Sequence, residues 1–279
     1  MNRYVLTAII AAALVSCGRS GDKGDARDKI AVSIAPLATL VDSLTCGDFD
    51  ITVLVPPGES PETFSPTPVR IRDVSDSRIY FGTGLMDFER ELERRMQGAG
   101  NGPRMVNLSE GIELAGGDEG HGADPHIWLS PKALKVMLRT AADAVLEEYP
   151  DSAKYEAAYR RLEARADSLE HALGAELERS RRRSFVIYHP ALTYYARDYA
   201  LRQIPIETEG KEPTATGLKR AIREAAADSV RHVLYQREYP VETVETVAAE
   251  IGALPAQIDP LNPDLFGELS RITELIAAP

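Results

Sequence analysis

The sequence predicts an α/β protein in which two α/β segments flank one long helix. Short apolar runs alternate with helical patterns over residues 29–108, and the same alternation returns after residue 183. Such alternation is typical of parallel sheets covered by helices. Between the two segments the pattern stays helical and highly charged for about thirty residues. Hydrophobic residues make up 44% of the chain and charged residues 27%, which excludes a largely disordered protein.

The first α/β segment is expected over residues 29–150. Its strands are expected at the apolar, β-branched runs 30–34, 51–55, 78–82 and 104–108. Its helices are expected at 36–46, 66–76, 85–97 and 131–149. Pro36 and Gly47 bound the first of these, and apolar residues recur at a spacing of three or four in the last. Residues 109–125 are rich in glycine and lack periodicity, which predicts a loop.

The long helix is expected over residues 151–183, directly after Pro150. A helix of thirty residues reaches about 45 Å, which is more than one small α/β domain needs. The pattern therefore leaves two interpretations, a coiled-coil segment or a helix that runs along two lobes and joins them.

The second α/β segment is expected over residues 184–279. Its strands are expected at residues 184–188, 203–206, 230–235 and 254–258. Its helices are expected at residues 191–200, 216–227, 241–251 and 264–277.

The N-terminus has the pattern of a secretory signal. In residues 1–16, Arg3 precedes an apolar run that is too short to span a bilayer permanently. The run ends in Leu14-Val15-Ser16-Cys17, which resembles the lipobox of bacterial lipoproteins. We therefore expect Cys17 to be lipidated, residues 17–28 to form a flexible tether, and the protein to be anchored on the periplasmic face of a bacterial membrane. Ordinary cleavage beside an incidental cysteine is the alternative.

The charge balance argues against one class of partner. The chain has 43 acidic and 32 basic residues, a formal net charge of −11. Phosphate binding requires a basic face, so we expect no nucleic acid partner. The charge is compatible with cationic ligands but does not identify one.

Four side chains of metal-ligand type follow expected strands or precede expected helices. Glu62 follows the run 51–55, His126 precedes the helix at residue 131, and His189 and Asp259 follow the strands 184–188 and 254–258. Open α/β folds bind ligands at the carboxyl edges of their strands. Two imidazoles and two carboxylates would suit a borderline or hard divalent cation and disfavour copper(I).

Several motifs surround these residues and appear in this order: Pro56-Pro57-Gly58, Ser60-Pro61-Glu62-Thr63-Phe64, Pro66-Thr67-Pro68, Asp124-Pro125-His126-Ile127-Trp128-Leu129-Ser130-Pro131, His189, Glu212-Pro213-Thr214 and Asp259-Pro260-Leu261. In these motifs the sequence resembles the zinc/manganese substrate-binding proteins of bacterial ABC importers (solute-binding protein family 9). The resemblance spans residues 29–279. It implies two α/β lobes with mainly parallel sheets, joined by one long rigid helix, and a metal site in the cleft between them with Glu62, His126, His189 and Asp259 as ligands.

One residue departs from the family pattern, because Glu62 stands where the family usually has histidine. A carboxylate hardens the site and weakens the preference for zinc over manganese or iron(II). The general affinity order still favours zinc over manganese. We expect zinc as the cargo first, manganese next and iron(II) third. Whether Glu62 is a direct ligand or is replaced by Glu59, His121 or water stays open.

The resemblance implies a high-affinity carrier that delivers its ion to ABC permease subunits in the inner membrane. We expect a monomer without enzymatic activity, and a metal affinity that falls below about pH 6 as the imidazoles protonate. A metal-dependent hydrolase and a metal-stabilised adhesin are the alternatives. The sequence contains no His-Glu-x-x-His motif of a zinc hydrolase.

Overall fold

A computed structural model describes residues 28–279, apart from 98–101, 117–121, 151, 208–212 and 229. The described chain forms two lobes, each built on a four-stranded parallel sheet. The N-terminal sheet has the order β2-β1-β3-β4, with strands β1 (Lys29–Val32), β2 (Asp50–Val53), β3 (Ile79–Gly82) and β4 (Arg104–Asn107). The C-terminal sheet has the order β6-β5-β7-β8, with strands β5 (Ser184–Ile187), β6 (Arg202–Pro205), β7 (His232–Gln236) and β8 (Leu254–Ile258).

The helices match the sequence patterns to within a few residues at each end. Thr67, Ser130, Thr214 and Asp264 start helices by accepting a backbone N–H with their side chains, as good N-caps do. A short 3₁₀ turn at Ile127–Leu129, which the sequence patterns did not indicate, precedes α4. The helices are α1 (Ala35–Thr45), α2 (Pro68–Ser75), α3 (Asp87–Gln97), α4 (Pro131–Glu148), α5 (Ala153–Ser180), α6 (Thr193–Asp198), α7 (Ala215–Ala227), α8 (Val241–Ile251) and α9 (Leu265–Ala277).

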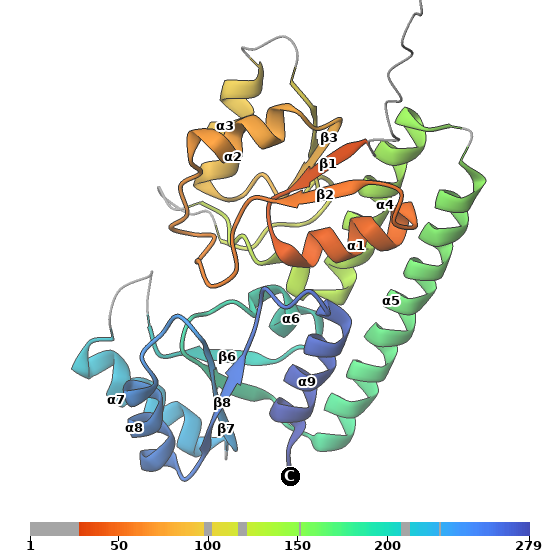
Figure 1. Cartoon of the computed structure of the whole chain (residues 1–279). Coiled ribbons are helices and arrows are strands. Elements are labelled where there is room, and N and C mark those ends of the chain that lie inside the picture. Colours follow the sequence, from red (N-terminus) through yellow and green to blue (C-terminus); the bar gives the residue numbers. More distant parts are fainter. Residues whose placement is uncertain (1–27, 98–101, 117–121, 151, 208–212, 229) are drawn as a thin grey trace, which may run out of the picture.

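Helix α5 runs along both lobes, as Figure 1 shows. It has 28 residues and packs against α1 and α4 of the N-terminal lobe and α9 of the C-terminal lobe. Its buried stripe includes Tyr155, Leu162 and Leu173, so helices of the same chain cover the apolar face that a coiled coil would need for a partner. The structure therefore favours the joining helix over the coiled-coil interpretation.

The two faces of the C-terminal sheet belong to different cores. In β5, Phe185 and Ile187 join a core that continues into the N-terminal lobe. Val186 and Tyr188, which point the other way along the same chain, pack under α7 and α8 in a separate cluster. The interface between the lobes is therefore part of the main core.

Hydrogen bonds from the loop before α4 tie the lobes together. The indole Nε1 of Trp128 donates to the carbonyl of Pro260 at 2.8 Å, and the Tyr194 hydroxyl donates to the carbonyl of Asp124 at 2.7 Å. The same hydroxyl accepts the N–H of Ala115 at 3.1 Å. The glycine-rich loop, expected to lack structure, contains an isolated β-bridge between Gly116 and Ala123. These contacts hold the described parts of that loop against the C-terminal lobe.

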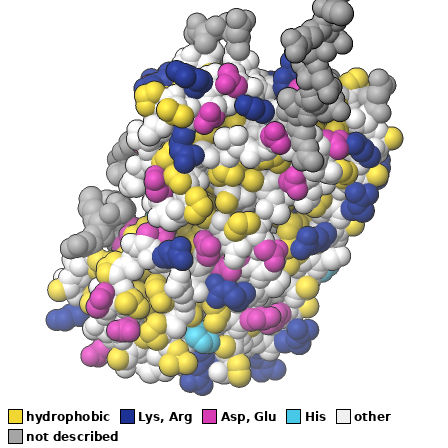
Figure 2. Space-filling view, viewed as in Figure 1, with side chains coloured by type: hydrophobic (Ala, Val, Ile, Leu, Met, Phe, Trp, Pro, Cys, Tyr) yellow, Lys and Arg dark blue, Asp and Glu magenta, His cyan; other side chains and the backbone are white. Residues whose placement is uncertain are grey.

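The signal sequence, Cys17 and all but the last residue of the tether lie outside the described residues. In the described part of the chain, no helix is both long and apolar enough to cross a bilayer. Acidic and basic side chains are interspersed on the face shown in Figure 2, without a continuous basic surface there.

Removing the Tyr194 hydroxyl should destabilise the protein. Tyr194→Phe leaves the N–H of Ala115 and the carbonyl of Asp124 without this partner, and we expect the free energy of unfolding to fall by about 1–3 kcal/mol. Urea denaturation measures this change. Tyr235→Phe is the matched control, because the Tyr235 hydroxyl has no hydrogen bond among the described residues. Equal effects of the two substitutions would contradict the assignment.

Candidate metal centre

Three of the four predicted ligands come together between the lobes. The ligand atoms of Glu62, His126 and His189 all lie within 4.8 Å of one another. Glu62 Oε1 is 3.6 Å from His126 Nε2 and 3.1 Å from His189 Nε2. Among the described residues, no other group of three or more His, Cys, Asp or Glu side chains meets the same spacing.

These separations fit ligands of one ion. Zinc lies about 2.0–2.1 Å from imidazole nitrogen and carboxylate oxygen, and tetrahedral ligands at that range stand about 3.3 Å apart. The cavity lined by the three residues has a volume of about 20 Å³, which is room for one water molecule or ion. The site is therefore shaped for a single small cation.

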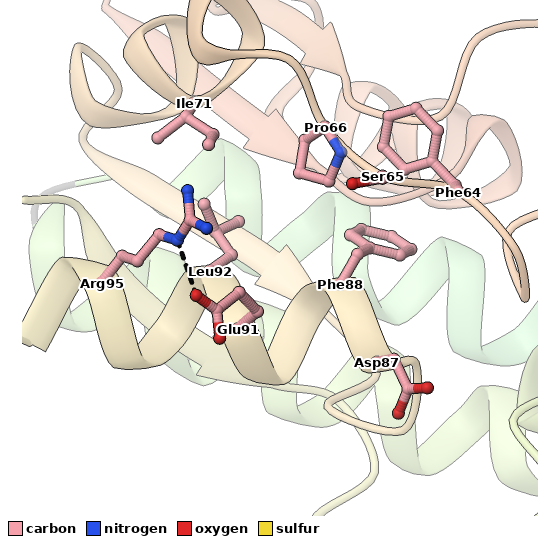
Figure 3. A pocket seen from close by; sticks show the side chains of 9 residues that line it. All are labelled: Phe64, Ser65, Pro66, Ile71, Asp87, Phe88, Glu91, Leu92 and Arg95. Atoms are coloured by element: carbon pink, nitrogen blue, oxygen red, sulfur yellow. Dashed lines mark hydrogen bonds and ion pairs between the residues drawn. The ribbon is translucent and has the colours of Figure 1, made fainter.

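Glu62 sits on a loop that is held at both ends. Leu54 and Val55 extend the pairing of β2 with β1 through backbone hydrogen bonds. Beyond Glu62, the ring of Phe64 packs edge-on against Phe88 of α3, with ring centres 5.1 Å apart. Figure 3 shows this contact and the apolar groove between the Phe64 segment, α2 and α3. The carboxylate remains 31% exposed, so it is the ligand most accessible to solvent.

His126 is oriented by Asp124. The Oδ1 atom of Asp124 accepts both the backbone N–H and the ring Nδ1–H of His126, each at 2.9 Å. This hydrogen bond places the ring proton of His126 on Nδ1. The Nε2 atom is then unprotonated and faces Glu62. The ring is nearly buried and packs against Trp128 with centres 5.2 Å apart. Although 18 residues separate this histidine from the end of β4 at Asn107, the loop returns it to the interface.

His189 follows β5 and is oriented by Glu207. Its Nδ1 lies 2.9 Å from Glu207 Oε1, and the Glu207 side chain is buried. The pairing of β6 with β5 continues past β6, because Ile206 donates to the carbonyl of Ile187 and Glu207 to that of Tyr188. This continued register is what places Glu207 beside the histidine.

The loop after β7 holds the other sides of His189. The Gln236 side chain donates to the carbonyl of His189 at 2.9 Å and accepts its N–H at 3.4 Å. The Tyr239 ring stacks on the imidazole, with centres 5.5 Å apart and planes 15° from parallel. Together with Glu207, these contacts fix both the backbone and the ring of this histidine.

In the metal-free site, the negative charges of Glu62 and Glu207 favour a proton on His189. Burial disfavours the protonated ring of His189, but hydrogen bonds with Glu207 and Glu62 and their charges outweigh this and raise its pKa to about 9. Burial would raise the pKa of Glu62, but the hydrogen bond from His189 and the charges of both histidines lower it overall. At neutral pH the metal-free site therefore holds a protonated imidazole against a carboxylate.

Asp259 lies outside this group, so the structure does not assemble the predicted four-residue cage. Its carboxylate accepts the N–H of Leu261 at 3.0 Å, and its own N–H donates to Glu268 at 2.7 Å. It lines a neighbouring cavity together with Glu59, another predicted candidate donor. The reason is strand order, since Asp259 follows the edge strand β8, which β7 separates from β5. His121, the remaining candidate, lies outside the described residues.

Sequence reasoning missed Glu207, Gln236 and Tyr239. For Glu207 a signal existed, because a carboxylate that follows a strand next to the histidine-bearing strand is a natural partner for Nδ1. Using that signal requires knowing that β6 is the neighbour of β5.

Comparisons with known proteins agree with this architecture. The family model described as "Zinc-uptake complex component A periplasmic" (ZnuA) matches residues 30–269. The high-affinity zinc uptake system protein ZnuA of Bacillus subtilis (strain 168) is 25% identical over 262 residues, 86% of this chain and 82% of that protein. The zinc-binding lipoprotein AdcA of Streptococcus pneumoniae is 24% identical over 280 residues, 92% of this chain but 54% of AdcA, so the chain spans about half of that relative.

Solved structures of ZnuA are also similar to this chain. A crystal structure of ZnuA superposes with a TM-score of 0.83 at 33% identity, covering 90% of this chain and 98% of the other. A ZnuA deletion mutant with zinc bound superposes with a TM-score of 0.81 at 34% identity, covering 90% and 96%. On the family match and these likenesses, this chain belongs to the ZnuA family of periplasmic components of zinc-uptake complexes.

Proposed function

We propose that this protein binds zinc outside the cytoplasm and delivers it to an ABC import permease, with Glu62, His126 and His189 as ligands. One observation carries the proposal. The Nε2 atoms of two nearly buried histidines converge on one carboxylate oxygen, and a carboxylate holds the Nδ1 atom of each ring. Metal-binding histidines are typically held in this way.

The donor set supports zinc as the first choice. Two imidazole nitrogens and a carboxylate oxygen suit a borderline ion, and mixed sites of this kind bind zinc more tightly than manganese or iron(II). Two relatives in sequence are named a zinc uptake protein and a zinc-binding lipoprotein, and a similar solved structure of ZnuA has zinc bound. Manganese and iron(II) remain the alternative cargoes, because Glu62 adds an oxygen donor where the family usually has nitrogen.

The dimensions of the site favour a carrier over an enzyme. A hydrolytic zinc site must hold an organic substrate beside the metal, whereas this cavity of about 20 Å³ has room for an ion or one water. The carrier role also uses the position of the site, since Glu62 and His126 come from one lobe and His189 from the other. An ion bound there joins the two lobes.

The lobes are already joined before an ion binds. Helix α5 packs on both, and Trp128 bonds across the interface to Pro260. We therefore infer that loading moves loops near the site and does not swing the lobes widely apart.

A lipid anchor fits this role. Cys17 in its lipobox-like context would carry acyl chains, and residues 18–28 would tether the protein to the periplasmic face of the membrane, near its permease. AdcA, a relative, is named a lipoprotein. We propose that the tethered protein acts as a monomer.

Elemental analysis and competitive titration test the proposal. The purified protein should bind one zinc ion, and His126→Ala and His189→Ala should each weaken zinc binding on the order of 100-fold or more, because each removes a ligand. His171→Ala is the control, since His171 lies exposed on α5 and does not line the cavity of the site. Full affinity in both site variants would refute the assignment, and tighter binding of manganese than zinc would reassign the cargo.

Zinc affinity should depend on pH well above the range expected for ordinary histidines. A ligating imidazole is unprotonated, so zinc must displace the proton of His189, whose pKa is about 9 in the metal-free site. We expect zinc affinity to fall about tenfold for each pH unit below that pKa. Unperturbed histidines would instead predict that the fall in affinity begins near pH 6. Calorimetry at pH 7.5 in buffers of different ionisation enthalpy should detect about one released proton. A constant affinity between pH 8 and pH 7 would contradict this.

Glu207→Gln should weaken zinc binding without removing a ligand. The amide neither attracts the His189 proton nor fixes the ring as a carboxylate does, and we expect a loss of about 10–100-fold. The number of protons released on binding at pH 7.5 should fall too, because the pKa of His189 drops when a charged partner is lost. Glu245→Gln, on the exposed face of α8, controls for the change in net charge. Unchanged proton release in Glu207→Gln would argue against this role.

A further inference from the structure

The cavity at the three ligands has a second acidic residue in its lining besides Glu62. Glu238 lies on the loop between β7 and α8 and lines this cavity with Glu62, His126 and His189. It also lines the neighbouring cavity, which contains Asp259. Asp259 itself does not line the cavity of the three ligands. Glu238 therefore lines the cavity of the three ligands and Asp259 does not, although neither carboxylate belongs to the group whose ligand atoms lie within 4.8 Å.

The two carboxylates also differ in their partners. Among the described residues, the Glu238 carboxylate makes no hydrogen bond or ion pair. Asp259 accepts the Leu261 N–H in a turn that a hydrogen bond from Asn262 to the Asp259 carbonyl closes. The Asp259 carboxylate is held in this turn by its bond to Leu261. Glu238 has a longer side chain and no such bond to lose.

Strand order also places the loop of Glu238 closer to His189 than the loop of Asp259. His189 follows β5, and Glu238 follows β7, the neighbouring strand. Asp259 follows β8, one strand further away. Because neighbouring strands lie about 4.8 Å apart, the chain enters its turn about 5 Å from β5 at Glu238 and about 10 Å from it at Asp259.

The loop that carries Glu238 is bound to His189. Gln236 clamps the backbone of the histidine, and Tyr239 stacks on its ring. A change in the position of His189 is therefore shared by the segment from Gln236 to Tyr239. These contacts fix the loop of Glu238 relative to the loop of His189.

We propose that Glu238 supplies the fourth donor to the bound ion, in place of Asp259. This inference rests on the proposed zinc site. Glu62 and His126 from the N-terminal lobe and His189 and Glu238 from the C-terminal lobe complete a tetrahedral set of two nitrogens and two oxygens. Two carboxylates balance the charge of a divalent cation. Glu238 lines the same cavity as the other three donors.

Single substitutions that keep side-chain size test this inference in the whole protein. Zinc affinity is measured by chelator competition, and the visible spectrum of bound Co²⁺ reports the ligand set. We expect Glu238→Gln to weaken zinc binding on the order of 100-fold and to change the Co²⁺ spectrum. Asp259→Asn should leave zinc affinity within about fivefold and the spectrum unchanged. Glu245→Gln, an exposed charge on α8 that lines neither cavity, should behave like Asp259→Asn.

The outcomes separate this inference from the proposed function. A large loss and a changed spectrum in Asp259→Asn, with little effect in Glu238→Gln, overturn the inference and restore Asp259 as the donor. A loss below fivefold and an unchanged spectrum in both variants also overturn it and assign the fourth position to water. Zinc binding that survives His126→Ala and His189→Ala instead refutes the site itself, whatever Glu238→Gln does.

Discussion

The structure depends on one contact, in which a single oxygen of Glu62 faces the Nε2 atoms of two histidines from different lobes. Each ring reaches that point because a carboxylate holds its opposite nitrogen, Asp124 for His126 and Glu207 for His189. The cluster concentrates negative charge, which an imidazolium balances in the metal-free protein and a divalent cation can balance in the loaded one. The fold supplies the positions, and this charge balance supplies the affinity.

The supporting residues are as specific as the ligands. Glu207 needs the register of β6 against β5, Gln236 needs the end of β7, and Asp124 needs the turn before the 3₁₀ segment. Asp124 and Glu207 each hold a ring nitrogen of one of the two histidines, and Gln236 holds the backbone of His189. A site built in this way is organised before the ion arrives, so little binding free energy is lost to ordering of the rings.

Local patterns were enough to predict the strands and helices and to single out His126 and His189. Both histidines stand beside abrupt changes of pattern, His126 before the capped start of α4 and His189 at the end of an apolar strand, and such signals are local. The separation of Asp259 from the other three residues has a different cause. Its motif resembles the family, but its distance from the other ligands depends on strand order, which no short segment encodes. Glu207 and Glu238 were missed for the same reason, because their importance comes from neighbouring strands.

The core shared by the two lobes has a consequence for how the whole molecule melts. Phe185 and Ile187 of the C-terminal sheet belong to the same apolar cluster as the N-terminal strands, and α5 covers both. Neither half can lose its packing without exposing the other, so the chain should denature in one cooperative transition. A ligand held at the seam between the halves then raises the melting temperature of all the secondary structure together, although it touches only a few side chains.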